Sequence, residues 1–597
     1  MRKRLESLLV DVTPRVVRER IPIFAALQRV RAKGYTRADF RADLLAGIVV
    51  GIVALPLSMA LSIAVGVAPQ HGLYTAVVAG IVVGITGGSK FQVTGPTAAF
   101  VVILAPIVTK YGLPGLLTAG FMAGIILIIM GIARFGRFIQ FIPHPVTTGF
   151  TAGIAVVIAT LQIKDICGIK LAAMPDGYTD KILALWRARH SASLSEFVVA
   201  SVTFALLLLV PRVLKRIPAP LVAIMLVSTT VALVHHFVPG FEVATIGTRF
   251  HSVVNGHEVA GIPPLPPHLM SPWGDADLNY AYLRELAPAA FAIAMLGAIE
   301  SLLSAVIADG MTGTRHDPNA ELVGLGIGNV IAPFFGGIAA TGALARTATN
   351  VRAGARSPMA AVVHSVAVLL SIVLLARFVA YIPMASLAAL LLLVAWNMAE
   401  VRHSWKVIRV APKSDVFVLL TCFLLTVVFD MVVSVGVGVV LAALLFMRRM
   451  TDVVSGRTIF ETDEVEREKL PAGVALYEIA GPLFFGAAKS AMDALDHIGE
   501  KARVVVLDLG RVPTIDATGL VALESACDKL HRAKKRAIIA GPLPKPTRVF
   551  DQFSKTAYIV GSRREALALA GKLTALERTE APPSRSLLPP DPDPHGA

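Results

Sequence analysis

The residues Thr94, Gly95, Pro96 and Thr97 lie in the middle of a long apolar run, where a sequence that breaks helices is unexpected. Proline suits the first position of a helix, so we expect Pro96 to open a helix with Thr94 or Gly95 as its N-cap. The first N–H groups of a helix have no partner inside the helix, and the helix dipole adds partial positive charge at the same end. This end could therefore bind an anion, with the N–H groups of Thr97 and Ala98 among the donors.

The same kind of break recurs in the second half of the chain. A Thr-Gly pair again follows a Gly-Gly pair, at Thr341 and Gly342, and a second helix should begin near Gly342, Ala343 and Leu344. Two helix starts that face one another could hold one anion between them. The alternative is that each break is only a kink whose freed backbone groups are satisfied by neighbouring helices.

Glu300 is the second candidate for chemistry. It lies fourteen residues into an uncharged run, roughly 21 Å along a helix at 1.5 Å per residue. A carboxyl group at that depth in a membrane segment is a functional candidate, and the chemistry it could do is proton binding. The alternative is a structural glutamate that bonds to Ser304, one turn further along the same face.

These groups need membrane-spanning elements to position them, and the composition predicts such elements. Hydrophobic residues make up 55% of the chain, charged residues only 16%, and the mean hydropathy is +0.69. Crossing a bilayer core of ~30 Å takes roughly 17 to 25 apolar residues. The full-length candidates are 43–66, 70–87, 113–132, 146–163, 197–214, 219–238, 286–309, 321–336, 358–379, 382–399, 415–430 and 431–447.

Two shorter apolar segments, 96–109 and 343–351, hold the breaks, and each is third in its half of the membrane region. Broken spans at matching positions are typical of transporters built from inverted repeats. Twelve full spans and two half spans make fourteen, so both ends of the chain should lie on one side, which Lys and Arg mark as cytosolic. The exception is the segment 164–190, which carries five Lys/Arg on the predicted outer side.

The chain outside the membrane region divides into four predicted parts. Residues 1–41 hold eleven Lys/Arg against four Asp/Glu and form a basic cytosolic arm, for which we expect no nucleic-acid partner. Residues 42–450 are the transport region and 451–470 a charged linker. Strand-like and helical runs then alternate through 471–575 and predict a small α/β domain. The proline-rich residues 576–597 should be disordered.

Several classes of chemistry lack a signal in the sequence. It contains no phosphate loop, no zinc-ligand spacing and no nucleophile triad, and Cys167, Cys422 and Cys527 form no CxxC pair. We therefore expect no catalytic residues, no metal and no cofactor. In the α/β domain, DATGL at 516–520 follows a buried strand and opens a helix, so capping of that helix by Asp516 or Thr518 is the simplest interpretation.

The chain resembles the sulfate permease (SulP) family, which includes solute carrier family 26, over nearly its whole length. The resemblance rests on residues 43–100, on 294–355 and on VVVLDLGRVPTIDATGL at 504–520. Within the family the chain is most similar to the bacterial C4-dicarboxylate transporter branch typified by DauA, through LGAIESLL, DGMTGT, NVRAGA and LLLVAWNM.

The resemblance implies an α-helical polytopic membrane protein with fourteen transmembrane segments as seven-plus-seven inverted repeats. A core of segments 1–4 and 8–11 would move against a gate of segments 5–7 and 12–14, followed by a C-terminal STAS domain. It further implies a homodimer in the bacterial inner membrane with both termini cytosolic. The STAS domain could bind cytosolic partners, and the STAS relatives that antagonise anti-sigma factors are phosphorylated on a hydroxyl residue at the position of Thr518.

The family's pocket residues can be carried over by position. The resemblance places Glu300 with proton-coupled relatives and Arg346 beside the pocket, where a structural bridge to Glu300 is the alternative. Leu57 and Leu61 stand where many members have glutamine and an aromatic residue, which argues against a pocket lined for sulfate. The substrate-binding positions are Thr97, Ala98, Gly342, Ala343, Leu344 and Ser304. Leu344 stands where a sodium-dependent bicarbonate carrier has threonine, which argues against sodium coupling.

The charges of these groups suggest a function. Two helix ends of about half a charge each, together with Arg346, give about +2, which matches a dianion when Glu300 is protonated. We therefore predict proton-coupled uptake of C4-dicarboxylates such as succinate, fumarate and aspartate by an elevator-type movement. The alternatives are a bicarbonate or sulfate transporter, an uncoupled anion channel or voltage-responsive membrane protein, and a scaffold that acts through its STAS domain.

Overall fold

The computed structural model describes residues 23–139, 142–171, 174–175, 177–214, 217–238, 241–254, 257–429, 431–453, 455–459, 470–484, 492, 502–541 and 557–580. The chain divides into two compact units, Met1–Val440 and Leu441–Ala597. Of the predicted basic arm, residues 1–22 lie outside the described residues, and α2 (Ala25–Lys33) is a helix within it.

The described helices supply the fourteen predicted membrane segments in the predicted order. Among the described residues, seven of these helices, and the stretch Met384–Val410 that joins α16 (Met384–Ala399) to α17 (Val401–Val410), are long and apolar enough to cross a bilayer. The helices are α3 (Arg37–Val65), α4 (Pro69–Thr86), α5 (Ala98–Ile132), α7 (His144–Ile166), α9 (Leu194–Val213), α10 (Ala219–Phe237), α12 (Tyr280–Thr312), α13 (Pro318–Ile331), α14 (Leu344–Arg352), α15 (Met359–Val379), α16 (Met384–Ala399), α18 (Lys413–Val428) and α19 (Met431–Val453). Helix α5 contains the third and fourth segments, which meet at a break at Gly112.

Shorter elements connect these helices. The segment between α10 and α12, which we predict to be an outer loop, holds an antiparallel pair of strands. The connecting elements are α6 (Gly136–Ile139), α8 (Tyr178–Arg187), α11 (Ile246–Arg249), β2 (His251–Val254), β3 (His257–Ala260) and α17 (Val401–Val410), with two 3₁₀ turns at Arg189–Ser191 and Ala332–Phe335.

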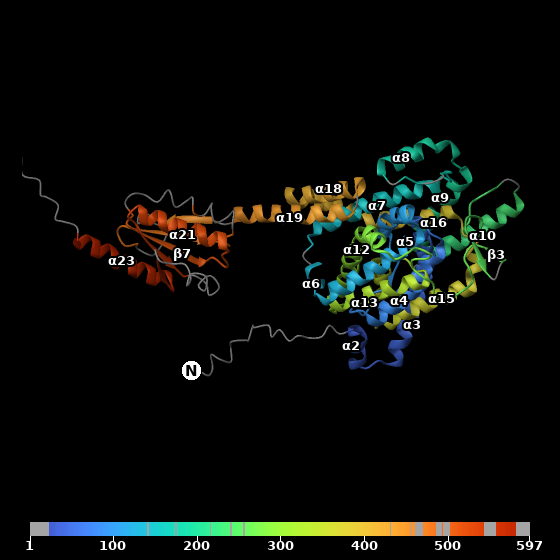
Figure 1. Ribbon diagram of the computed structural model, residues 1–597, viewed down its shortest axis with the longest axis horizontal. Coiled ribbons are helices and arrows are strands. Elements are labelled where there is room, and N and C mark those ends of the chain that lie inside the picture. The colour runs from blue at the N-terminus through green and yellow to red at the C-terminus, as the bar shows by residue number, and fades with distance from the viewer. Residues whose placement is uncertain are drawn as a thin grey trace, which may run out of the picture. The chain divides into compact units, whose positions relative to one another are not determined.

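The packing of the helices sorts them into two groups (Figure 1). The first group is α3, α4, α5, α12, α13, α14 and α15, and the second is α7, α9, α10, α16 and α18. In the first group α15 packs on α3 and α4, while α5 packs on α12 and α13. The fourth segment of each half therefore packs on the first two segments of the other half. In the second group the fifth segment of each half packs on the sixth segment of the other half, α7 on α18 and α16 on α9.

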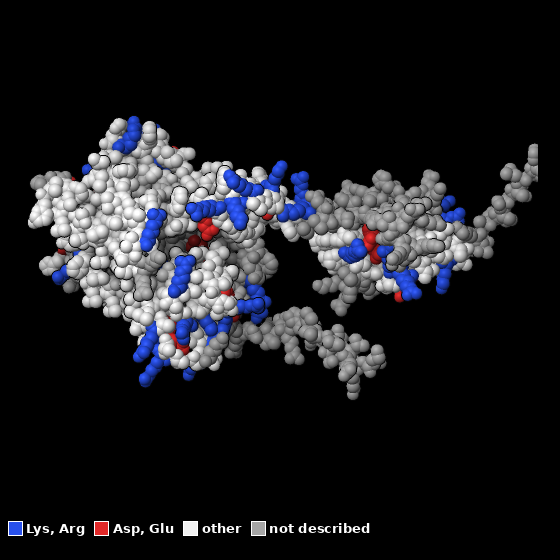
Figure 2. All heavy atoms as spheres, turned by 180° about the vertical axis from the view of Figure 1, so that it is seen from behind, with Lys and Arg blue, Asp and Glu red and all other residues white. Residues whose placement is uncertain are grey.

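Small residues let helices of the first group approach closely, as membrane helices commonly do. A Cβ atom on Gly47 of α3 would lie 2.6 Å from the Ala360 carbonyl oxygen of α15, and one on Gly124 of α5 would lie 2.7 Å from that of Gly326 in α13. The outside of this unit is apolar, and Figure 2 shows broad areas of it without charged side chains.

The two predicted breaks meet in space. Strand β1 (Thr94–Gly95) pairs antiparallel with β4 (Thr341–Gly342), with Thr94 opposite Gly342 and Gly95 opposite Thr341. All four residues are buried. The two-residue strands thus give backbone partners to the broken segments in a place where water cannot supply them.

The predicted start of the first broken helix is wrong by two residues. Helix α5 begins at Ala98 with Thr97 at the N-cap, and Pro96 precedes both. The reason is the strand pair, which keeps Thr94 and Gly95 extended. The second start is confirmed, because α14 begins at Leu344 with Ala343 at its N-cap.

The second unit contains the predicted α/β domain. Its five-stranded sheet has the order β5 (Ser455–Ile459), β6 (Val474–Ala480), β7 (Val504–Arg511), β8 (Arg536–Ala540) and β9 (Ala557–Val560). Strands β6 to β9 are parallel and β5 is antiparallel to β6. Strand β5 lies within the predicted linker 451–470, so part of that segment joins the sheet. The predicted disordered tail 576–597 is wrong for residues 576–580, which form the end of helix α23 (Arg563–Glu580), and residues 581–597 lie outside the described residues.

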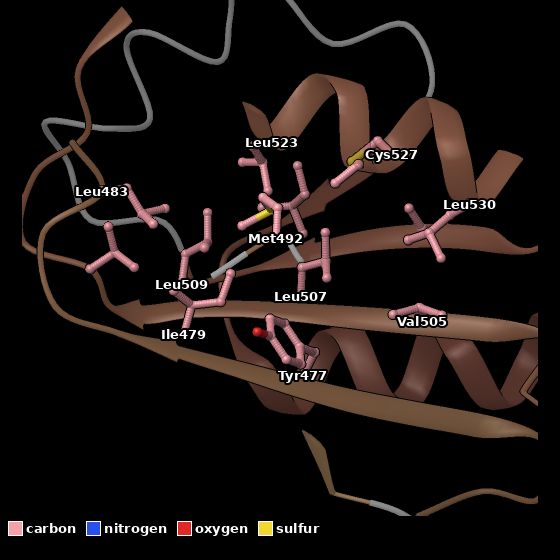
Figure 3. Close-up of a cluster of buried hydrophobic side chains, with 14 of the residues drawn as sticks. Tyr477, Ile479, Leu483, Met492, Val505, Leu507, Leu509, Leu523, Cys527 and Leu530 are labelled. Atoms are coloured by element: carbon pink, nitrogen blue, oxygen red, sulfur yellow. The ribbon is translucent and has the colours of Figure 1, made fainter. Parts of the chain in front are cut away.

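The sheet of this domain has an apolar core that also accounts for one cysteine. Helix α21 (Ala517–Arg532) covers a cluster that includes Tyr477, Leu507, Leu523 and Cys527 (Figure 3). Burial raises the pKa of the Cys527 thiol to about 12. Its thiolate is therefore scarce, and Cys527 acts as a small core residue. Helix α23 (Arg563–Glu580) contributes to a second cluster with residues of the same sheet.

The strand pair depends on glycine at position 342. A Cβ atom there would lie 2.2 Å from Gln92 Nε2 and 3.0 Å from the Cα atom of Ser301. We expect Gly342→Ala to lower the free energy of unfolding by about 1–3 kcal/mol through overpacking, measured as a lower thermal midpoint of the purified protein. Gly310→Ala, in α12 with open space around its Cα, is the control and should leave the midpoint unchanged or raise it. Equal midpoints for Gly342→Ala and the wild type would contradict this account.

Candidate functional site

Both broken helices begin without a side-chain cap. The Thr97 side chain makes no capping bond to α5, and Ala343 has no group that could cap α14. Helices α5 and α14 leave the antiparallel β1–β4 pair in opposite directions, so their starts lie on either side of it. Their first backbone N–H groups are therefore available as donors beside two positive dipole ends.

The Thr97 hydroxyl is used by another group. Its Oγ1 donates to Glu300 Oε2 at 2.8 Å. Glu300 is partly buried in the middle of α12, and this bond places its carboxyl group directly beside the start of α5. The predicted anion-binding helix start and the predicted proton-binding group therefore form one site.

A stripe of small residues on α12 supports both breaks. The Gly297 carbonyl accepts from Thr341 Oγ1 at 2.9 Å, and Ser301 Oγ accepts from Gln92 Nε2. Ser304 Oγ donates to Thr347 Oγ1 at 3.1 Å. The positions 297, 301 and 304 are spaced as one helix face, a signal that the sequence contained and that we did not use.

Ser304 therefore has a different partner from the one that its sequence position suggested. It is fully buried and bonded to Thr347 of α14, while Glu300 is bonded to Thr97. The alternative of a local pair between Glu300 and Ser304 is therefore wrong, because each side chain reaches another segment. Ser304 links α12 to the start of α14.

The residues around the α14 start differ in what they can offer an anion. The Ala343 N–H donates to the Val93 carbonyl at 2.8 Å and is not free. Gly342 is buried in the strand pair. Leu344, the first residue of α14, has a side chain that is 43% exposed, so this helix start borders open space. On the α5 side, Ala98 is buried and Thr97 is partly exposed. The first bond within α14 is from the Thr347 N–H to the Ala343 carbonyl, so the N–H groups of Leu344, Ala345 and Arg346 have no partner within the helix.

Arg346 lies behind the strand pair. It is fully buried, and its Nη2 donates to the Pro96 carbonyl at 3.0 Å and to Ser58 Oγ at 3.2 Å. Its Nε and Nη1 have no hydrogen-bond partner among the described residues. A Cβ atom on Gly95 would lie 2.3 Å from Nη1, so the guanidinium passes directly beside this glycine. In this part of the chain no ion pair joins Arg346 to Glu300, which overturns the alternative of a structural bridge.

Two buried carboxylates hold the loops that lead into and out of the broken helices. Glu321 Oε2 accepts from the N–H groups of Gly88 and Ser89, both at 2.8 Å, ahead of β1. Asp43 Oδ1 accepts from the N–H groups of Arg356 at 2.6 Å and Ser357 at 3.0 Å, after α14. The roles of both carboxylates could not be predicted from local sequence, because their partners lie more than two hundred residues away in the chain.

In the α/β domain, Asp516 is the N-cap of α21, and its Oδ1 accepts from the Gly519 N–H at 2.7 Å. This confirms capping by Asp516. Thr518 is exposed in the first turn of the helix. Its hydroxyl is therefore accessible at a helix N-terminus.

The fold defines a class of protein: a polytopic helical membrane protein with two broken helices that begin on either side of one buried strand pair. The Sulfate permease family model matches residues 40–422, and the STAS domain model matches residues 468–567. The chain belongs to the sulfate permease family, and its second unit is a STAS domain. It is thus a multi-pass anion transporter.

Relatives cover most of the chain. The putative sulfate transporter YvdB of Bacillus subtilis is 40% identical over 479 residues, which is 80% of this chain and 87% of that protein. The bicarbonate transporter BicA of a Picosynechococcus species is 28% identical over 492 residues, which is 79% of this chain and 83% of that protein.

Solved structures support the fold. Murine Slc26a9, an anion transporter in the inward-facing state, has a TM-score of 0.78 and 17% sequence identity, covering 92% of this chain and 94% of that chain. The transmembrane domain of a cyanobacterial BicA has a TM-score of 0.57 and 26% identity, covering 68% of this chain and 98% of that chain.

The position of Arg346 leads to a test based on ligand charge. An arginine that acts on the anion only through its field contributes in proportion to ligand charge, so on this hypothesis Arg346→Ala weakens the binding of a dianion by about twice the free energy lost for a monoanion. Calorimetry with succinate and with a monocarboxylate on purified variants measures both losses. Arg346→Lys keeps the charge while changing the bonds to Ser58 and Pro96, and should keep the preference for the dianion. Equal losses for both ligands in Arg346→Ala would show that the arginine acts through structure alone.

Proposed function

We propose that this transporter is a secondary active carrier that couples the uptake of a small dianion to protons. The observation that carries the proposal is the hydrogen bond between Thr97, at the start of α5, and Glu300, in the middle of α12. It links the group that would carry the proton to the helix start that would hold the anion. A passive pore needs no such carboxyl group.

The anion would be held mainly by backbone N–H groups. The donors would be those of Thr97 and Ala98 on one side and of Leu344 and Ala345 on the other. Side chains at these positions offer almost no further donors. The two helix ends and Arg346 supply about +2, so a dianion would be neutralised when Glu300 is protonated, and an ionised Glu300 would leave about +1.

The Thr97 hydroxyl offers a physical mechanism for coupling. A hydroxyl both donates and accepts, so it can satisfy Glu300 in either protonation state. When Glu300 is ionised, Thr97 donates to it. When Glu300 is protonated, the carboxyl group donates to the Thr97 oxygen, and the Thr97 hydrogen is free to turn toward an anion. Proton binding would thus add one donor to the site and remove one negative charge.

The substrate that we propose is a C4-dicarboxylate, as in the DauA branch. The sequence motifs of that branch and the apolar Leu57 and Leu61 in α3 support this choice. Sulfate and bicarbonate are the second candidates, because the relatives YvdB and BicA are described as transporters of these anions. Uptake of labelled succinate, sulfate and bicarbonate by proteoliposomes under imposed pH or sodium gradients separates them.

The same proposal covers movement and regulation. The first helix group, which holds the site, would move against the second in an elevator-type cycle of a homodimer. The placement of Lys and Arg supports an orientation with both termini in the cytosol of a bacterial cell. A phosphoryl group on Thr518 would be stabilised at the N-terminus of α21, which makes this residue the proposed regulatory site of the STAS domain.

Glu300→Gln tests proton coupling. Glutamine imitates the protonated acid, so we expect the variant to bind succinate without a requirement for low pH but to lose uptake driven by a pH gradient. Binding by calorimetry over a pH series and uptake by proteoliposomes measure the two effects. Full gradient-driven uptake by the variant, or strict dependence of the wild type on sodium, would refute the coupling.

Leu344→Pro tests the backbone donors. Proline is favoured at the first helical position, and the preceding Ala343 is already extended, so α14 should form as before. The substitution removes one N–H, and we expect dianion binding to weaken by about 1.5–3 kcal/mol, the range for a hydrogen bond to a charged group. Leu344→Ala is the control, because it shortens the side chain and keeps the N–H. Equal affinities of the two variants would show that the Leu344 N–H does not bind the anion.

A further inference from the structure

Helix α17 carries two parallel stripes of different character, one basic and one apolar. Residues separated by four and then three positions lie along one face of a helix. Two sets with this spacing run side by side along α17, because each basic residue directly follows an apolar one in the chain. The basic stripe is Arg402, Lys406 and Arg409, and the apolar stripe is Val401, Trp405 and Ile408.

The chain turns at both ends of α17, so this helix does not continue the membrane segments beside it. Glu400, which precedes it, has a left-handed backbone with φ 40° and ψ 48°, and Ala411, which follows it, is extended. The connection between α16 and α18 lies on the predicted cytosolic side. Three basic residues among ten are unfavourable in hydrocarbon, although the stretch Met384–Val410 is long enough to cross it. We therefore expect α17 to lie at the cytosolic surface of the membrane.

Helix α17 packs on the protein through the side that faces away from the basic stripe. Ser404 and Val407 on that side are partly buried. The His403 ring lies edge-on to the ring of His144, at the start of α7, with 5.2 Å between the centroids. The helices on which α17 packs are α7 and α16, both of the second group. The basic stripe is thus turned away from that group.

The protein does not neutralise the basic stripe. Its three side chains are exposed, and within the described ranges neither Arg402 nor Lys406 takes part in an ion pair or a side-chain hydrogen bond. The Arg409 guanidinium lies over the Trp405 ring, 5.0 Å from its centroid, and this cation–π contact joins the two stripes. Glu400 is the one acidic residue between positions 397 and 412 of the sequence. The stripe therefore has an excess of positive charge.

The apolar stripe is also open. Val401 is 49% exposed and Trp405 is 55% exposed, and Trp396, near the end of α16, is 66% exposed. Tryptophan concentrates at the membrane–water interface, because its ring is apolar while its N–H needs a polar partner. A helix with basic residues on one face and tryptophan on another is typical of a helix that lies in the interface plane.

We propose that α17 binds anionic phospholipid of the cytosolic leaflet, with the headgroup phosphates on the basic stripe and Trp405 at the boundary of the acyl chains. Lipid fits better than a soluble acidic partner, because the basic stripe adjoins an open apolar stripe and α17 lies between two membrane segments. Since α17 packs on the second helix group, bound lipid would anchor the group against which the first is proposed to move. The anchoring rests on the proposed function, and the binding of lipid does not.

The first experiment measures this binding on the purified full-length protein in detergent. Phosphatidylglycerol or phosphatidylcholine with brominated acyl chains quenches nearby tryptophan, and a parallel Trp405→Phe titration isolates the signal of Trp405. Each basic residue near an anionic surface strengthens binding about fivefold. Arg402→Gln/Lys406→Gln should therefore raise the phosphatidylglycerol concentration at half-maximal quenching roughly twentyfold and leave that of phosphatidylcholine unchanged. Arg402→Lys/Lys406→Arg keeps both charges and should behave as the wild type.

A matched control separates α17 from the general positive charge of the cytosolic side. Arg37 and Arg41 in the first turns of α3 are exposed, are also four residues apart and lie on the same predicted side. Arg37→Gln/Arg41→Gln should change the concentration at half-maximal quenching of Trp405 less than about twofold, because salt screens distant charges. An unchanged concentration in the Arg402→Gln/Lys406→Gln variant, or an equal rise in the control pair, would overturn the proposal.

The second experiment locates Trp405 along the lipid. Phosphatidylglycerol brominated close to the headgroup should quench Trp405 more strongly than the same lipid brominated close to the end of the acyl chain, as expected for a helix in the interface. Stronger quenching by the deep label would place α17 in the hydrocarbon. No quenching by either label would show that protein covers the helix instead of lipid. Both of these results would contradict the proposal.

Discussion

The antiparallel pair of Thr94–Gly95 with Thr341–Gly342 is the interaction on which the membrane unit depends. A helix broken in hydrocarbon exposes N–H and C=O groups whose loss of partners costs several kcal/mol each. Here each break supplies the partner of the other, and the Ala343 N–H adds one more bond, to Val93. The two helix starts can then keep their own N–H groups free. The N–H groups at the helix starts can remain without protein partners because the backbone groups one or two residues earlier are hydrogen-bonded in the strand pair.

The supporting residues follow from this pair. Glycine is needed at 95 and 342 because Arg346 and Gln92 pass directly beside these backbones. Residues of α12 accept or donate hydrogen bonds to both broken segments, as Gly297 does through its carbonyl for Thr341. Arg346 of α14 donates to the Pro96 carbonyl and so links the second broken segment to the first. Other buried polar bonds run within each helix group, such as Ser365 to the Ala76 carbonyl in the first and Thr203 to Ser386 in the second. Buried hydrogen bonds within each helix group favour a rigid structure for that group.

The sequence predicted features that are local and periodic. Apolar length located the membrane segments, the repeated Thr-Gly pair located the breaks, and strand-to-helix alternation located the STAS domain. It failed where a partner lies far away in the chain. Pro96 had the right chemistry for the first position of a helix, but the pairing of Gly95 with Thr341, 246 residues later, keeps the preceding segment extended. The alternative that Glu300 bonds to Ser304, one turn away, is wrong for the same reason, because Glu300 bonds to Thr97 before α5 and Ser304 bonds to Thr347 of α14.

Backbone donors have a consequence for selectivity in the proposed site. An N–H group is present whatever the side chain, so helix starts alone would accept sulfate, bicarbonate and dicarboxylates in similar ways. The charge of the site, set by Arg346 and by the protonation of Glu300, would separate monoanions from dianions. Sulfate and succinate carry the same charge, so charge cannot separate them. Discrimination between them must come from the size and shape of apolar side chains at the helix starts, and the exposed Leu344 is the side chain placed to provide it.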